Sequence, residues 1–144
     1  MKIAIASDHA GYDLKEKLKE YLEEIGYKVV DFGTYSEGAV DYPDFALKVA
    51  KVVGNKKFKM GILVCGTGIG MSIVANKVKD VRAAVCWNEK TAELSRKHND
   101  SNVLCLGARL LKWNKVKKIV DIWLNTKFER GRHLRRIKKI DKLL

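Results

Sequence analysis

The segment "KMGILVCGTGIGMS" at residues 59–72 decides the fold, because an apolar run changes there into a glycine-rich turn and then into a helical pattern. The run ends at Cys65, and glycines follow at alternate positions. A short buried strand that leads through a tight turn into a helix is the opening of a β-α-β unit. The segment therefore predicts a parallel sheet, provided that the rest of the chain repeats the pattern.

The same alternation of apolar runs and amphipathic stretches continues along the chain. The predicted strands cover residues 2–7, 27–32, 59–65, 81–86 and 102–107, and the predicted helices cover 11–25, 44–54, 70–79, 89–98, 112–124 and about 130–143. We therefore predict an α/β fold, a three-layer α/β/α Rossmann-like domain with a five-stranded parallel sheet and a basic C-terminal helix. One domain would span residues 1–144, with 129–144 as a helical extension. Ligands of such sheets bind at the carboxyl ends of the strands, where Ser7, Cys65, Trp87 and Gly107 would lie.

Composition narrows the functional classes. The chain has 144 residues, of which 47% are hydrophobic and 32% charged, enough for one packed core. No apolar stretch approaches a membrane span and the N-terminus has no signal-peptide pattern, so we expect a cytoplasmic protein with no membrane partner. The three cysteines show no paired spacing, which argues against a disulfide framework or a zinc site.

The glycine-rich turn has two functional interpretations. Nucleotide binding is the first, but the glycines form G-x-G-x-G instead of G-x-G-x-x-G, and no Lys-Ser/Thr pair follows them. In the second, backbone N–H groups of the turn hold an oxyanion, and the start of the helix favours the thiolate of Cys65. Such a pair suits proton abstraction next to a carbonyl group. A buried structural cysteine remains the alternative.

The C-terminal segment carries most of the charge. Residues 112–144 contain 12 lysines and arginines against three acids, and so hold nine of the net +12 charges. Arg132 and Arg136 are four residues apart on one helix face and can converge on a phosphate. Leu134, Ile137, Ile140 and Leu144 would form the apolar face of this helix. An RNA-binding surface is the alternative, although no aromatic platform accompanies the cations.

Five motifs in order along the chain carry a family resemblance. They are "SDHAG" (7–11), "DYPDFA" (41–46), "CGTGIG" (65–70), "RKHNDSNVLCLGAR" (96–109) and "GRHLRR" (131–136). Together they resemble the type B ribose-5-phosphate isomerases, whose family also includes allose and galactose 6-phosphate isomerases. The resemblance covers almost the whole chain and implies an aldose-ketose isomerase.

The resemblance implies roles for individual residues. Ribose 5-phosphate and ribulose 5-phosphate would interconvert through a cis-enediolate without a metal or cofactor, with Cys65 as the base and His98 opening the sugar ring. The expected substrate-binding residues are Asp8, His9, Gly66, Thr67, Gly68, Ile69, Gly70, Asn99, Arg109, Arg132 and Arg136, with Tyr42 as a weaker candidate.

The resemblance also implies a homodimer or a dimer of dimers, with no nucleic-acid partner. His98 and Asn99 would reach the site from the second subunit. His98 precedes the last strand, so it is expected at the sheet edge opposite Cys65 in its own chain. Allose or galactose 6-phosphate remains the alternative substrate.

Overall fold

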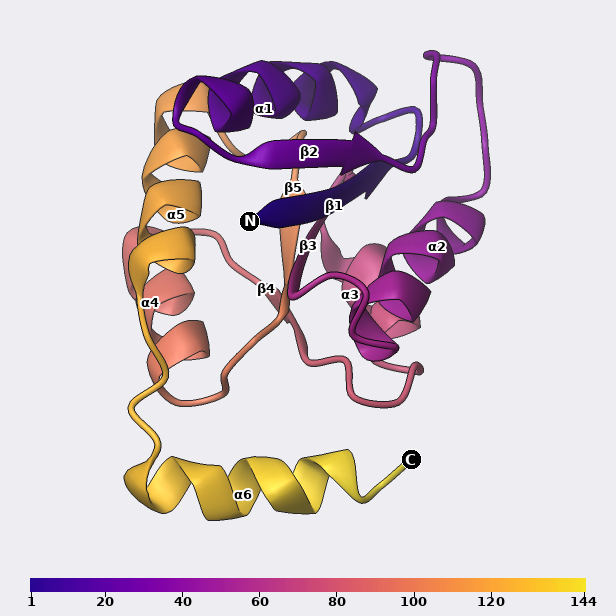
Figure 1. Ribbon diagram of the computed structural model, residues 1–144. Helices are drawn as coiled ribbons and strands as arrows, with labels where there is room; N and C mark the ends of the chain where they lie inside the picture. Colours follow the sequence, from indigo (N-terminus) through magenta and orange to yellow (C-terminus); the bar gives the residue numbers. More distant parts are fainter.

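The computed structural model describes residues 1–144 and confirms the predicted parallel sheet of five strands, in the order β2-β1-β3-β5-β4 (Figure 1). The strands are β1 (Lys2–Ser7), β2 (Lys28–Asp31), β3 (Met60–Cys65), β4 (Ala83–Val85) and β5 (Val103–Gly107). The helices are α1 (Tyr12–Glu24), α2 (Tyr42–Gly54), α3 (Ile69–Ala75), α4 (Glu89–Lys97), α5 (Trp113–Asn125) and α6 (Gly131–Asp141). None of these helices is long and apolar enough to cross a membrane.

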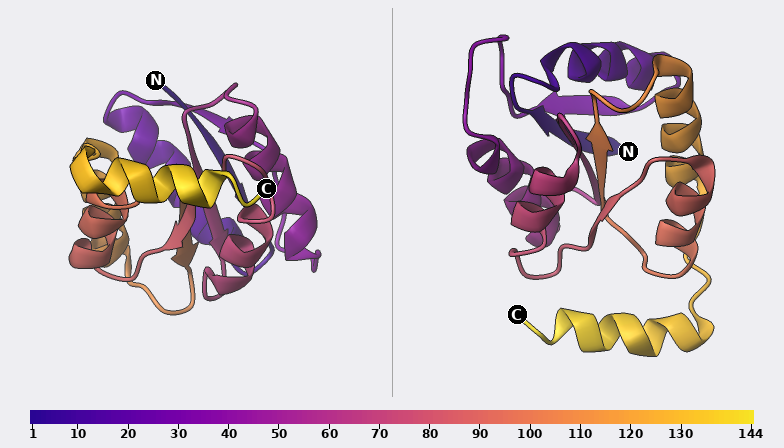
Figure 2. Two further views of the ribbon diagram at one scale, coloured as in Figure 1. Left: turned by 90° about the horizontal axis from the view of Figure 1, so that it is seen from below. Right: turned by 180° about the vertical axis from the view of Figure 1, so that it is seen from behind.

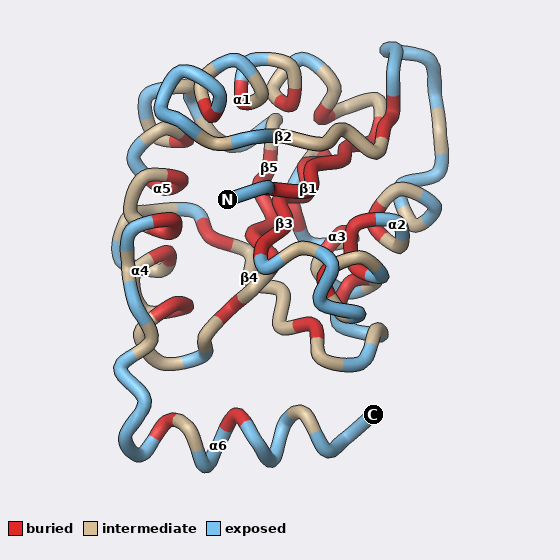
Figure 3. The backbone as a smooth tube through the Cα atoms, in the orientation of Figure 1, coloured by how far each residue is buried: buried red, intermediate tan, exposed pale blue.

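The alternation of side chains along the strands builds a core on each face of the sheet. In β1, Ile3 and Ile5 point into a cluster completed by α1, α4 and α5, whereas Ala4 and Ala6 point into a second cluster under α2 and α3. The strands β1, β3 and β5 accordingly form the buried centre of the molecule, whereas the outer strands β2 and β4 are less buried (Figure 3). Helices on both faces confirm the predicted three layers.

Most elements are one to three residues shorter than the sequence predicts, and α3 and β4 show a physical reason. Helix α3 ends at Ala75 instead of residue 79, and β4 covers only 83–85 instead of 81–86. The amide of Asn76 explains part of the difference, because its Oδ1 accepts from the backbone N–H of Ala83 at 2.8 Å and its Nδ2 donates to the Ala83 carbonyl at 3.0 Å. The backbone N–H of Arg82 likewise donates to the side chain of Asn102 at 2.8 Å. Side-chain amides thus take the place of further helix and ladder bonds.

Helix α6 lies across the amino ends of the strands, apart from the two helical layers (Figure 2). An ion pair of 3.0 Å between Arg82 Nη1 and Asp141 Oδ1 ties its last turn to the start of β4. The predicted apolar face is only partly correct. Ile137 is buried, but Ile140 and Leu144 are 46% and 59% exposed, and His133 is the other residue that α6 buries.

Candidate functional site

The carboxyl ends of β1 and β3 meet where the chain changes direction across the sheet. From β1 the chain passes through α1 to the edge strand β2, whereas from β3 it passes through α3 to β4, the edge strand on the other side. Connections that diverge in this way leave a crevice between the two strand ends, the usual ligand site of an open α/β sheet. Asp8 and His9 follow β1, and the glycine turn follows Cys65 at the end of β3.

The thiol of Cys65 faces the glycine turn. Its side chain is 5% exposed, and Sγ accepts the backbone N–H of Gly68 at 3.1 Å. The N–H of Ile69 is occupied by the Thr67 hydroxyl at 3.2 Å, whereas the N–H groups of Gly66, Thr67 and Gly70 donate to no group of the chain. The turn therefore has a sulfur and free backbone donors close together.

The other two cysteines have different surroundings. Burial raises the pKa of Cys86, against the opposing effect of hydrogen bonds with Ser95 and Thr91. Complete burial, followed by the influence of Cys65 and Cys86, raises the pKa of Cys105 well above its usual value. Both thiols are therefore held in the protonated form, which is a poor base.

Several predicted binding residues do surround this turn. Arg109 lies against it, since a side-chain carbon added at Gly66 would be 3.4 Å from Arg109 Nη1. The ring of Tyr42 packs similarly against Gly70. A carboxylate oxygen of Asp8 accepts the backbone N–H of Gly11 at 3.0 Å, which fixes Asp8 at the start of the connection to α1.

His9 connects the carboxyl end of β1 to the segment that precedes α2. Its Nδ1 accepts the backbone N–H of Val40 at 3.2 Å. The segment from Gly33 to Val40 is anchored at its beginning as well, because the Thr34 N–H donates to the Ser7 carbonyl at 2.8 Å. The long connection after β2 thus passes over the end of β1.

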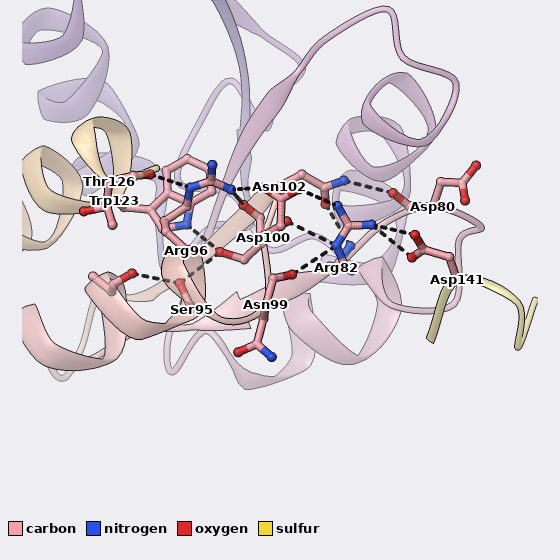
Figure 4. Close-up of polar contacts among 12 residues, drawn as sticks. Asp80, Arg82, Ser95, Arg96, Asn99, Asp100, Asn102, Trp123, Thr126 and Asp141 are labelled. Atoms are coloured by element: carbon pink, nitrogen blue, oxygen red, sulfur yellow. Dashed lines mark hydrogen bonds and ion pairs between the residues drawn. The ribbon is translucent and has the colours of Figure 1, made fainter. Parts of the chain in front are cut away.

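The remaining predicted residues lie at the amino ends of the strands, on the side of the sheet opposite Cys65, as the sequence predicts for His98. Helix α4 starts with a capping box between Asn88 and Thr91, and His98 is its C-cap residue. Asn99 follows, with its carbonyl accepting from Arg82 Nε at 3.1 Å and its side chain directed away from this network (Figure 4). Arg132 and Arg136 are exposed on α6 at the same edge. One chain therefore does not bring these four residues to Cys65.

Hydrogen bonds from Arg96 fix the turn that carries His98 and Asn99. Arg96 Nη1 donates to the Ser101 carbonyl at 2.6 Å and to Asp100 at 2.9 Å (Figure 4). Arg96 Nε donates to the Thr126 carbonyl at 3.2 Å, just after α5. The turn is therefore fixed from the core side, while the side chain of Asn99 points away from this network and that of His98 is 38% exposed (Figure 4).

A hollow of about 530 Å³ also opens at this edge, bordered partly by Arg82, Arg96, Asp100 and Asp141. Arg82 is paired with Asp141 and Arg96 with Asp100, so these charges largely neutralise one another. Lys56, Lys59 and Asp80, which form no ion pair, also border the hollow, so acidic and basic groups are mixed along its lining.

Sequence reasoning missed two residues that contact His98. Glu129 Oε1 lies 3.6 Å from His98 Nε2, and the ring of His133 stacks on that of His98 with centroids 4.3 Å apart. The helical spacing distinguishes only an apolar and a basic face, and so it does not predict that His133 is buried. The histidine inside "GRHLRR" and the lone acid before it were the available signals.

Comparisons with known proteins agree on one family. The model of the family described as Ribose/Galactose Isomerase matches residues 3–140. Ribose-5-phosphate isomerase B of Escherichia coli (strain K12) is 46% identical over 139 residues, which cover 96% of this chain and 93% of the relative. The probable ribose-5-phosphate isomerase B of Mycoplasma genitalium is 51% identical over 140 residues, covering 96% and 92%.

Solved structures agree with these sequences. Ribose-5-phosphate isomerase B of Clostridium thermocellum is 50% identical, with a TM-score of 0.98 over 99% of this chain and 97% of that one. The Mycoplasma genitalium enzyme, solved with bound ribulose 5-phosphate, is 49% identical, with a TM-score of 0.94 over 99% and 95%. The similarity extends over the whole chain, including α6.

Proposed function

The chain belongs to the ribose/galactose isomerase family, and from this premise we propose that it interconverts ribose 5-phosphate and ribulose 5-phosphate. The relative with bound ribulose 5-phosphate, similar over 99% of this chain, supports the pentose phosphate as substrate. The single observation in this structure that supports the chemistry is the contact of 3.1 Å between Cys65 Sγ and the Gly68 N–H in a turn with unoccupied backbone donors.

The proposed isomerisation is a proton transfer between neighbouring carbons. Cys65 takes the proton from C2 of the open-chain aldose, the hydroxyl proton moves from O2 to O1 within the resulting cis-enediolate, and Cys65 returns its proton to C1, which gives the ketose. The negative charge that develops on the sugar oxygen is stabilised by the free N–H groups of Gly66, Thr67 and Gly70. Asp8 binds sugar hydroxyls, and Tyr42 lines the pocket.

The proposed phosphate site combines residues from both edges of the sheet. Arg109 lies beside the glycine turn and His9 follows the neighbouring end of β1, whereas Arg132 and Arg136 lie on α6. In a symmetric dimer, the side of one chain that carries the amino ends of the strands faces the side of the other chain that carries the carboxyl ends. This contact brings all four residues together. The same contact delivers His98 and Asn99, so that His98 opens the furanose ring before Cys65 acts.

The decisive experiment is an isomerisation assay on ribose 5-phosphate, allose 6-phosphate and galactose 6-phosphate. We expect turnover of ribose 5-phosphate, and a loss of at least about 100-fold in Cys65→Ala, because general acid–base catalysis contributes roughly 10²–10⁴-fold. The matched control is Cys86→Ala, another buried cysteine, which should retain most activity. Undiminished turnover by folded Cys65→Ala would refute the assigned base, and faster turnover of a hexose phosphate would refute the assigned substrate.

A further inference from the structure

Three polar side chains converge between the end of α4 and the start of α6. They are His98, Glu129 and His133, whose nitrogen and oxygen atoms lie within 4.8 Å of one another. Glu129 reaches this place because its backbone N–H donates to the Lys97 carbonyl at 3.1 Å. The first turn of α6 places His133 over the ring of His98, with the ring planes only 16° apart.

A metal site is the first interpretation of two histidines and a carboxylate, but the local charge and geometry oppose it. Arg132 and Arg136 lie close enough to influence His133, and they would repel a divalent cation. Nearly parallel stacked rings also cannot direct the lone pairs of both histidines towards one ion at the short distance that a metal needs. The cluster is better explained by proton transfer.

We propose that Glu129 and His133 are positioning residues for His98, an inference that depends on the ring-opening role assigned to His98 in the proposed function. Glu129 lies 3.6 Å from His98 Nε2 and so attracts the positive form of the imidazole. Nδ1, which makes no hydrogen bond in the chain, is left to exchange a proton with the sugar. A carboxylate that orients a catalytic histidine through its other nitrogen is a recurrent arrangement in enzymes.

His133 supports the same arrangement as a neutral partner. Burial lowers the pKa of His133, and the neighbouring charges of His98, Arg132 and Arg136 lower it further, against the opposing effect of Glu129. His133 therefore remains uncharged when His98 carries its proton. Its ring covers one face of the His98 ring, which keeps the imidazole plane fixed while the 38% exposed side chain remains accessible.

The proton balance of ring opening fits one positioned histidine. The imidazolium Nδ1–H gives its proton to the ring oxygen as the bond between C1 and that oxygen breaks. The anomeric hydroxyl, now part of a protonated carbonyl, returns a proton to Nδ1. The histidine ends as an imidazolium again, still held by Glu129, and the sugar is an open-chain aldehyde.

The test separates ring opening from the proton transfer by Cys65. Ribulose 5-phosphate has no furanose form because its C5 oxygen carries the phosphate, so exchange of its C1 hydrogen with D₂O needs the enediolate but no ring opening. We expect Glu129→Gln to slow conversion of ribose 5-phosphate by about 10- to 100-fold, a part of the effect of general acid–base catalysis, and to leave this exchange within about twofold. Glu93→Gln, which removes a carboxylate from α4 that pairs with Lys90 and Lys97, is the matched control and should change neither rate.

The variants of His133 test the stack. His133→Phe keeps a neutral ring and should retain the ribose 5-phosphate rate, whereas His133→Ala should lower it; circular dichroism and thermal unfolding show whether each variant is folded. Equal loss of both rates in Glu129→Gln, or no loss in either, would overturn the proposal. If the unmodified protein isomerised no sugar phosphate, the proposed function would fail instead. The ¹⁵N shifts of the His98 imidazole would then still test the contact, since Glu129→Gln should change them and unchanged shifts would exclude it.

Discussion

The backbone N–H of Gly68 points at Cys65 Sγ from 3.1 Å, across a turn in which Gly68 has a φ of +82°. The orientation of the proposed base is thus coupled to a left-handed backbone conformation that side chains disfavour. The same residue is the N-cap of α3, so the thiol, the turn and the helix depend on one glycine.

Gly68→Ala should therefore damage both stability and activity. An added Cβ would lie 3.1 Å from the Leu106 carbonyl carbon, and the positive φ costs an L-residue about 1–2 kcal/mol. We expect a loss of at least about 1 kcal/mol in urea unfolding and at least about tenfold in turnover, since relief of the strain moves the N–H away from Sγ. Gly26→Ala is the control, because its φ is +99° but nothing lies within 4 Å of the added carbon. It should lose stability alone; full activity in Gly68→Ala would contradict the coupling.

The buried ion pairs of Lys15 predict a large effect of its removal on the stability of the fold. Its side chain is 0% exposed, and Nζ contacts Asp31 at 2.6 Å and Glu16 at 2.9 Å, which links α1 to the end of β2. Lys15→Ala removes a buried partner of Asp31 and should cost about 3 kcal/mol in chemical denaturation. Lys19→Ala, whose side chain is 28% exposed and also contacts Asp31, should cost less than about 1 kcal/mol. Similar losses in the two variants would show that burial does not set the energy of this network.

The sequence predicts the fold well because strand and helix patterns are local. Apolar runs such as residues 59–65 and the helical spacing of residues 11–25 survive in the structure with small changes at their ends. The errors occur where side chains replace backbone bonds, as with Asn76 beside β4. The spatial order of the strands could not be predicted, since it depends on which apolar faces pack together.

The sequence likewise predicts one part of the candidate site and misses another. The grouping of Cys65 with the glycine turn follows from adjacency in the sequence, and the separation of His98 from Cys65 follows from its place before β5. By contrast, the contact of His133 with His98 joins positions 35 residues apart through the path of α6. No periodicity in the helix itself reveals that path.

The lowered pKa of His133 predicts that acid loosens α6. Burial, then the charges of His98 and Arg132, lower the pKa below its usual 6.5, so the unfolded state takes up a proton at a higher pH than the folded state. Stability is therefore complete above about pH 6.5 and decreases as the pH falls through the lower value of the folded state. Hydrogen exchange of the α6 amides, corrected for intrinsic rates, should show weaker protection at pH 5.5 than at pH 7.5. His133→Phe should remove the difference, and equal protection at both pH values in the unmodified protein would contradict the prediction.

A site shared between subunits predicts complementation between two inactive variants. The Cys65→Ala chain still supplies His98, and the His98→Asn chain still supplies Cys65. A mixed dimer therefore contains one complete site and one site that lacks both groups. Random exchange of equal amounts should restore about a quarter of the activity of the unmodified protein, because half of the dimers are mixed and each has one working site. Replacing the His98→Asn partner by a chain with both substitutions is the control and should restore nothing. If differently tagged copies purify together and the first mixture is still inactive, Cys65 and His98 do not act in one site across the interface.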